Sequence, residues 1–276
     1  MSGARQPADA SGLMEAVLAE GGRRALRGYG GALLGGAVIV AAFFYADALN
    51  FARYRDALPT LWALLADSLP PDFSRWRSWG RPLAETLAMS ICGTVIATVA
   101  AAPLGAIAAR GSGHRIAGAA VRLMLNTIRS IPGVVWGVLF VAAVGFGPLP
   151  GLLALACHST GMLGKFYAEI IEHVDPMPGD ALRSHGGSRL AVLRFTVLPQ
   201  ILPRIADVTL YRWEHNVRAA TVLGVVGAGG IGLELVTAFH LFEYREAMAL
   251  ILVILGVVSL INLIGAWLRG RFLASA

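Results

Sequence analysis

The residues best suited to chemistry lie in one polar stretch of an otherwise apolar chain. Arg212, Glu214, His215, Asn216 and Arg218 follow one another between long runs without charge, and several of them share one helical stripe. A guanidinium group matches the shape and charge of a small oxyanion. Ionisable residues in apolar segments are costly and usually face a cavity or a partner. The stretch therefore predicts a path for an anion.

Two further polar residues, His158 and Ser159, occur in the preceding apolar segment and could line the same path. Two alternatives compete with this interpretation. Glu214 and Arg218 are four residues apart in the order that favours an ion pair along a helix, so they could form a self-neutralising structural pair. Glu214 and His215 could instead relay protons in a secondary transporter, although no inverted repeat is apparent. His158 alone is more often a packed, hydrogen-bonded residue.

Other motifs in the chain carry less weight. The glycines 227, 229 and 232 match a dinucleotide-binding fingerprint, but no strand precedes them. A helix break or a close packing site is the better interpretation. The chain contains no G-x-x-x-x-G-K-[ST] motif, so ATP hydrolysis must take place on another subunit. We expect no catalytic residue, no metal site and no cofactor.

The composition indicates that these residues belong to an integral membrane protein. Hydrophobic residues make up 56% of the chain and charged residues 14%, with a mean hydropathy of +0.65. Soluble domains average about 25% charged residues. The apolar runs are continuous rather than alternating, which favours membrane helices over a barrel. The net charge of +6 suggests contact with membrane lipid rather than nucleic acid, because no nucleic-acid-binding module is recognisable.

The apolar runs predict an all-α protein with six transmembrane helices. A cytoplasmic tail is expected over residues 1–27, a first transmembrane helix over 28–49, a periplasmic segment over 50–82, a core over 83–268 and a cytoplasmic tail over 269–276. Within the core, spans are expected at about 86–109, 122–144, up to 171, 204–226 and 247–268. A cleaved signal peptide is the competing interpretation of the first apolar run. Arginines are twice as frequent in the inner segments as in the outer ones, which places both termini in the cytoplasm.

The same topology places a polar segment at residues 172–203 in the cytoplasm. Pro178 and Asp180 suit the first turn of a short helix. Gly186 and Gly187 permit a left-handed stop, and Ser188 can cap a second helix. The Leu-Pro pairs at 198–199 and 202–203 are expected to break that helix before the next span. The result would be a helix-turn-helix knob with an exposed apolar edge.

The spacing within residues 180–199 resembles the EAA loop, by which permeases of ABC importers grip their ATPase subunits. The residues that carry the resemblance are Asp180, Ala181, Leu182, Gly186, Leu198 and Pro199. Residues 129–132, 158–176 and 211–232 are similar to permeases of phosphonate importers, so the likeness covers about residues 80–268. Two positions depart from the pattern: Asp180 replaces the usual glutamate, and Gly133 follows Pro132 where an acid is expected. The second departure, Gly133, concerns which oxyanion the protein would carry.

The resemblance implies a fold, a function and a set of partners. The fold would be that of a type I ABC importer permease in the bacterial inner membrane. The function would be ATP-driven import of phosphonate or a related phosphorus oxyanion, with import of another small solute as the alternative. The partners would be a second permease subunit, two ATPase subunits and a periplasmic or lipoprotein substrate-binding protein.

Overall fold

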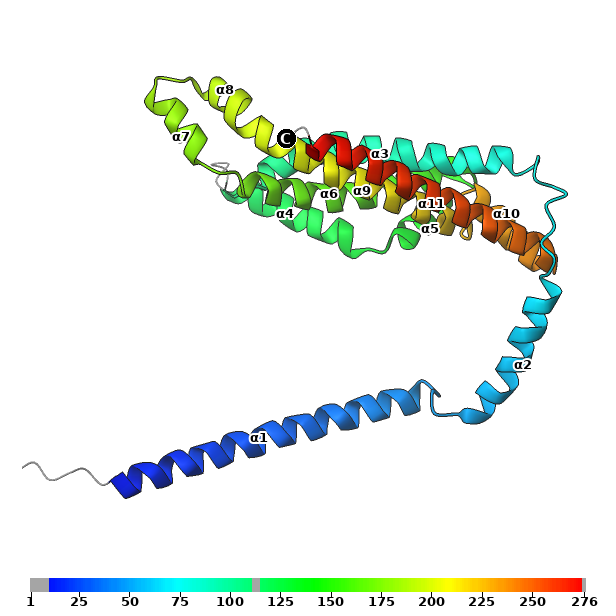
Figure 1. Cartoon of the computed structure of the whole chain (residues 1–276), viewed down its shortest axis with the longest axis horizontal. Coiled ribbons are helices and arrows are strands. Elements are labelled where there is room, and N and C mark those ends of the chain that lie inside the picture. The colour runs from blue at the N-terminus through cyan, green and yellow to red at the C-terminus, as the bar shows by residue number, and fades with distance from the viewer. Residues whose placement is uncertain (1–9, 111–114, 275–276) are drawn as a thin grey trace, which may run out of the picture. The chain divides into compact units, whose positions relative to one another are not determined.

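The computed structural model describes residues 10–110 and 115–274, and every regular element within those ranges is a helix. The chain divides into two units, Met1–Leu65 and Ala66–Ala276. Figure 1 shows a helical bundle in the second unit and the long first helix in the first.

The first unit consists of α1 (Ala10–Tyr45) and most of α2 (Phe51–Asp67). The predicted tail, from Ala10, and the predicted first span form one continuous helix that ends at Tyr45, four residues before the predicted end at 49. Residues 1–9 lie outside the described part. Between the helices, Asp47 has a positive φ of 56° and its carboxylate pairs with Arg53 at 2.9 Å. Helix α2 lies within residues 50–82, the segment expected to be periplasmic, and the sequence did not predict this helix.

In the second unit, α6 (Pro148–Glu172) contacts four other helices: α3 (Gly80–Ala108), α4 (Arg115–Ser130), α5 (Gly133–Val144) and α9 (Leu198–Gly224). Small residues let α3 and α6 approach closely: a Cβ on Gly105 would lie 2.7 Å from the Cβ of Tyr167, and one on Gly93 would lie 2.9 Å from the Cβ of Leu155. Such contacts replace the hydrophobic drive that lipid does not supply. They fix α6 as the centre of the bundle.

The third predicted span is two helices rather than one. Helix α4 runs over Arg115–Ser130 and α5 over Gly133–Val144, with a bend of 88° between them. Pro132 stands at the N-cap of α5 with ψ of 141°. Proline disfavours helical backbone at the residue before it and cannot donate an N–H. The prediction of a single helix over 122–144 was wrong for this reason.

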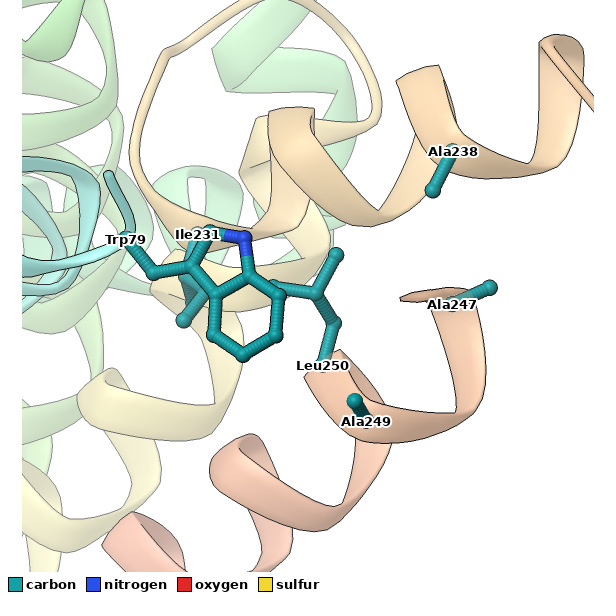
Figure 2. Close-up of a cluster of buried hydrophobic side chains, with 6 residues drawn as sticks. All are labelled: Trp79, Ile231, Ala238, Ala247, Ala249 and Leu250. Carbon is teal, nitrogen blue, oxygen red and sulfur yellow. The ribbon is translucent and has the colours of Figure 1, made fainter. Parts of the chain in front are cut away.

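A glycine-rich break separates α9 from α10 (Ile231–His240), as expected for residues 226–232. Gly227, Gly229 and Gly230 all have positive φ, of 91°, 74° and 72°. Helix α11 (Tyr244–Ala274) then closes the described chain. Figure 2 shows Trp79 against Ile231 and Leu250, beside the alanines of α10 and α11. The Nε1 of Trp79 donates to Glu246 at 3.2 Å, so this contact ties the start of α3 to α11.

Three helices within the described ranges are long and apolar enough to cross a membrane: Gly28–Tyr45, Gly80–Ala108 and Tyr244–Arg271. The bent pair α4 and α5 makes a fourth if it is counted as one span. Helices α6 and α9, with 25 and 27 residues, are long enough to cross, but they carry more polar residues. Helix α9 begins six residues before the predicted start of the fifth span.

Candidate functional site

A cavity of about 300 Å³ lies between α5, α6 and α9. Two guanidinium and two imidazole side chains line it: Arg212, Arg218, His158 and His215. The rest of the lining is apolar or glycine and includes Gly133, Leu155 and Val222. None of these lining residues carries a carboxylate, so the charged groups at this cavity within the described chain are all basic.

Hydrogen bonds to residues outside the cavity lining fix the position of Arg212. The Nε of Arg212 donates to Ser159 Oγ at 2.9 Å, and that hydroxyl donates to Asn216 Oδ1 at 3.0 Å. The amide of Asn216 donates in turn to Thr94 Oγ1 at 2.8 Å. Ser159 and Asn216 are fully buried and do not line the cavity. Their position makes them supports for Arg212 rather than groups that a solute would touch.

The guanidinium of Arg212 retains an unused donor. Only 4% of the residue is exposed, and its Nη2 is buried without a hydrogen-bond acceptor in the described part of the chain. A buried cation that lacks a counter-charge is costly unless something else compensates it. An anion in the adjacent cavity would supply that compensation.

Glu214 and Arg218 do not pair with each other, contrary to the structural alternative. Glu214 is buried and forms an ion pair with Arg269 of α11. Arg218 donates from Nη1 to Asn262 Oδ1, also in α11, at 3.0 Å. Glu214 therefore faces α11, whereas Arg218 lines the cavity. Of the residues predicted for the path, His158, Arg212 and Arg218 are brought together, and Glu214 is directed elsewhere.

His158 connects the cavity to the broken helix. Its Nδ1 lies 3.2 Å from the carbonyl oxygen of Ile131, at the bend between α4 and α5. Gly133 and Val134, the first residues of α5, also line the cavity. His215, a member of the same polar stretch, also lines the cavity, whereas the sequence gave no sign of Thr94 or Asn262. Those two residues are reached only through contacts between distant helices.

The polar segment at residues 172–203 forms the predicted pair of helices. Helix α7 (Met177–Ser184) carries Asp180 in its first turn, where the carboxylate pairs with Arg183 at 2.8 Å. Gly186 follows with φ of 82°. Ser188 caps α8 (Arg189–Val192) by accepting from the N–H of Ala191 at 3.2 Å. The stop and the cap occur where the sequence predicted them.

The second helix of this segment does not break before α9, and that prediction was wrong. A π-helical turn, Leu193–Val197, joins α8 directly to α9, with Leu198 and Pro199 at the start of α9. Because the wider turn changes the hydrogen-bond spacing, the chain continues through Pro199. The side chain of Gln200 donates to the carbonyl of Thr196 at 2.8 Å. This bond satisfies one backbone acceptor at the junction.

The segment leaves a large apolar surface uncovered. Met177, Leu190 and Phe195 are 74%, 73% and 67% exposed. Ala181 and Gly186 are also exposed, and Leu182 is half-buried. Exposed apolar side chains of this kind are candidates for contact with a partner.

The chain is similar in sequence to known membrane components of transport systems. The family of inner-membrane components of binding-protein-dependent transport systems matches residues 101–274. A phosphite transport system permease protein of Stutzerimonas stutzeri is 48% identical over 85% of this chain and 86% of its own length.

The chain belongs to this family of inner-membrane transport components. It is a multi-pass membrane protein and a translocation subunit rather than an enzyme. A phosphate-import permease protein of Mycolicibacterium smegmatis is 39% identical over 78% of the chain and 40% of its own length. Membership removes the grounds for the secondary-transporter interpretation.

Solved structures support the fold of the permease. A subunit of an amino acid ABC transporter superposes with a TM-score of 0.62 at 17% identity, over 75% of this chain and all of that one. A subunit of an inward-facing methionine ABC transporter gives 0.61 at 21% identity, over 70% and 95%. The permease therefore shares the helical fold of ABC transporter membrane subunits.

Proposed function

We propose that this permease carries a phosphorus oxyanion, such as phosphite, a phosphonate, hypophosphite or phosphate, across the inner membrane. The cavity at Arg212 and Arg218 is the observation that carries the proposal. Its two guanidinium groups suit a tetrahedral oxyanion, and the buried Nη2 of Arg212 has a donor to offer. The names of the relatives from Stutzerimonas stutzeri and Mycolicibacterium smegmatis support this class of solute.

The proposed path uses each polar residue in a distinct way. Arg212, Arg218 and His158 contact the solute, whereas Ser159 and Asn216 orient Arg212 through the bonds at 2.9 and 3.0 Å. Glu214 fixes α9 against α11 through Arg269. Because the acceptor that holds Arg212, the hydroxyl of Ser159, is neutral, the positive charge of the guanidinium is not compensated there and remains available to attract an anion.

The proposed assembly contains two permease subunits, two ATPase subunits and an external substrate-binding protein. Each permease would have six spans, including α6, α9 and the bent α4 and α5 pair, with both termini in the cytoplasm. The segment from α7 to Pro199 is the proposed contact with the ATPase, because its apolar side chains are exposed. Closure of the ATPases would move these segments together and change the access of the cavity from inside to outside.

Uptake by proteoliposomes containing the permease, its ATPase and its binding protein tests the proposal. Arg218→Gln and Arg212→Gln should each reduce uptake of radiolabelled phosphite at least about tenfold, since each removes a charge-assisted contact. The ATPase should still assemble with both variants. Arg81→Gln is the matched control, because the Arg81 side chain is 89% exposed and forms a surface ion pair with Glu85 four residues away.

The choice of oxyanion is measured on the binding protein, which is titrated separately with phosphite, phosphonate and phosphate. Wild-type uptake of none of these anions would contradict the proposed class of solute. Unchanged uptake by both arginine variants would instead remove the cavity from the path.

A further inference from the structure

A second cavity, of about 440 Å³, lies at the end of the bundle that carries α7, between the end of α3, α4 and α6. It shares no lining residue with the cavity at Arg212. Its charged lining consists of four cations and two carboxylates, with one histidine: Arg110, Arg122, Arg129, Lys165, Glu169, Glu172 and His173. The balance of formal charge is therefore positive.

Glycines on α6 bring the cations of α4 and α6 together. A Cβ on Gly164 would lie 2.7 Å from Leu125 of α4, and one on Gly161 would lie 2.9 Å from the backbone nitrogen of Arg129. The two helices can therefore approach closely at these points. This contact places Arg129 of α4 and Lys165 of α6 on the wall of one cavity.

Both carboxylates of the cavity already have partners. Glu169 pairs with Lys165 at 3.4 Å, and Glu172 accepts the backbone N–H of Arg110 at 2.8 Å. The two arginines of α4 that line the cavity instead donate to neutral acceptors. Arg122 donates to the carbonyl of Ala108, and Arg129 donates from Nε to Asn126 Oδ1 at 3.1 Å.

Arg122 and Arg129 thus have no carboxylate within ion-pair distance in the part of the chain that is described. The bond of Arg129 uses only Nε, which leaves the two terminal nitrogens for another acceptor. A planar guanidinium with paired terminal donors fits a phosphate group in a bidentate arrangement.

We propose that this cavity binds a phosphate group, with Arg129 as the main ligand and Lys165 and Arg122 beside it. Basic pockets between helices at the cytoplasmic side of a membrane bind anionic headgroups, and free inorganic phosphate presents the same oxygens. The ligand is therefore a phosphate group from one of these two sources. The site shares no residue with the proposed transport path, and its position on the cytoplasmic side rests on the proposed topology.

Binding to the full-length permease in nanodiscs of phosphatidylcholine tests the free-phosphate source. Equilibrium dialysis with radiolabelled inorganic phosphate should give about tenfold weaker binding for Arg129→Gln than for wild type, which corresponds to the loss of one charge-assisted contact. Arg115→Gln is the matched control, because it removes the same charge from the same helix at an exposed position outside the cavity.

Native mass spectrometry of the detergent-solubilised permease, titrated with phosphatidylglycerol, tests the lipid source. Bound phosphatidylglycerol that is lost in Arg129→Gln and kept in Arg115→Gln would assign the site to a headgroup. Glu169→Gln removes a carboxylate that competes with the ligand, so it should strengthen binding of phosphate or phosphatidylglycerol, whichever the site binds. A gain in binding cannot result from a folding defect, so this variant separates a role in binding from a role in folding. The proposal is overturned if Arg129→Gln and Glu169→Gln bind both phosphate and phosphatidylglycerol as wild type does, or if wild type binds neither.

Discussion

The Nε of Arg212 donates to the hydroxyl of Ser159 at 2.9 Å, although the two residues are 53 positions apart in the chain. One of the three guanidinium nitrogens of Arg212 is thereby hydrogen-bonded to a neutral group. The bond orients the side chain but does not neutralise its charge. The relationship links α6 to α9 at the proposed transport cavity.

Removal of the Ser159 hydroxyl should weaken transport, although Arg212, the residue proposed to contact the solute, is still present. In Ser159→Ala, Arg212 loses an acceptor and Asn216 loses a donor in a buried network, so we expect kcat/KM for oxyanion uptake to fall about tenfold. Initial uptake rates in proteoliposomes over a range of solute concentrations give this value. Ser259→Ala, at an exposed position of α11, is the control. Equal rates for the two variants would show that the bond has no role in transport.

The left-handed glycine between α7 and α8 should be sensitive to a side chain. Gly186 has φ of 82°, but a Cβ added to it would meet no atom within 4 Å. Gly186→Ala therefore introduces backbone strain of about 1–2 kcal/mol and no clash. We expect less ATPase to co-purify with this variant, together with slower ATP-dependent uptake.

Two variants separate strain at Gly186 from the added methyl group. Gly186→Asn should recover most of the association, because asparagine tolerates this conformation. Gly256→Ala, in α11 with nothing within 4 Å, is the matched control. Normal association of Gly186→Ala would contradict the role of this turn.

The ion pair between Glu214 and Arg269 should contribute strongly to stability. Glu214 is only 7% exposed at its side chain, whereas Arg269 is 24% exposed. Arg269→Gln leaves the carboxylate buried without its main partner, which costs about 3–5 kcal/mol for a buried pair. We expect Arg269→Gln to have a lower melting temperature in detergent than wild type. Size-exclusion chromatography of samples heated to increasing temperatures measures this difference.

The double variant of this pair provides the control. Glu214→Gln with Arg269→Gln removes both charges and should recover part of the lost melting temperature. A double variant no more stable than Arg269→Gln would show that the pair does not act as a unit.

Asp72 should make the stability of the permease depend on pH under acidic conditions. The backbone N–H of Ser74 donates to its carboxylate at 2.8 Å, and this bond, with the Ser74 hydroxyl second, lowers the pKa of Asp72 below its ordinary value. The stabilising contribution is therefore complete above about pH 4 and is lost as the pH falls through the lowered pKa.

The melting temperatures of wild type and Asp72→Asn, measured from pH 7 downward, check this prediction. Wild type should be the more stable at neutral pH, and the difference should shrink below about pH 4. Asp67→Asn, which changes an exposed carboxylate of α2, is the control. A difference that grows on acidification would contradict the assignment.

Local features of the fold could be predicted from the sequence because they depend on single residues. Gly186 stops α7, Ser188 caps α8, and the glycines after α9 turn the chain, as their backbone preferences require. The helical spacing also placed His215 and Arg218 on one stripe, with Arg212 beside it. Each of these features is fixed by residues within a few positions of it.

Features that depend on distant contacts could not be predicted in this way. Glu214 pairs with a residue 55 positions away, rather than with the arginine one turn along its own helix. The π-helical turn before Pro199 let a helix continue where a local rule required a break. The bend at Pro132 is different, since the proline was visible and its effect was underestimated.

The break at Pro132 leaves backbone amides as well as side chains at the proposed transport cavity. Helix α5 begins at Gly133, whose N–H and that of Val134 have no acceptor within the helix. The partial positive charge of a helix N-terminus favours an anion, and both residues line the cavity. A glycine at this position adds no side chain over those amides, and it adds no carboxylate where the family pattern would supply one. The bend thus adds main-chain amides to the groups that we propose to recognise a negatively charged solute.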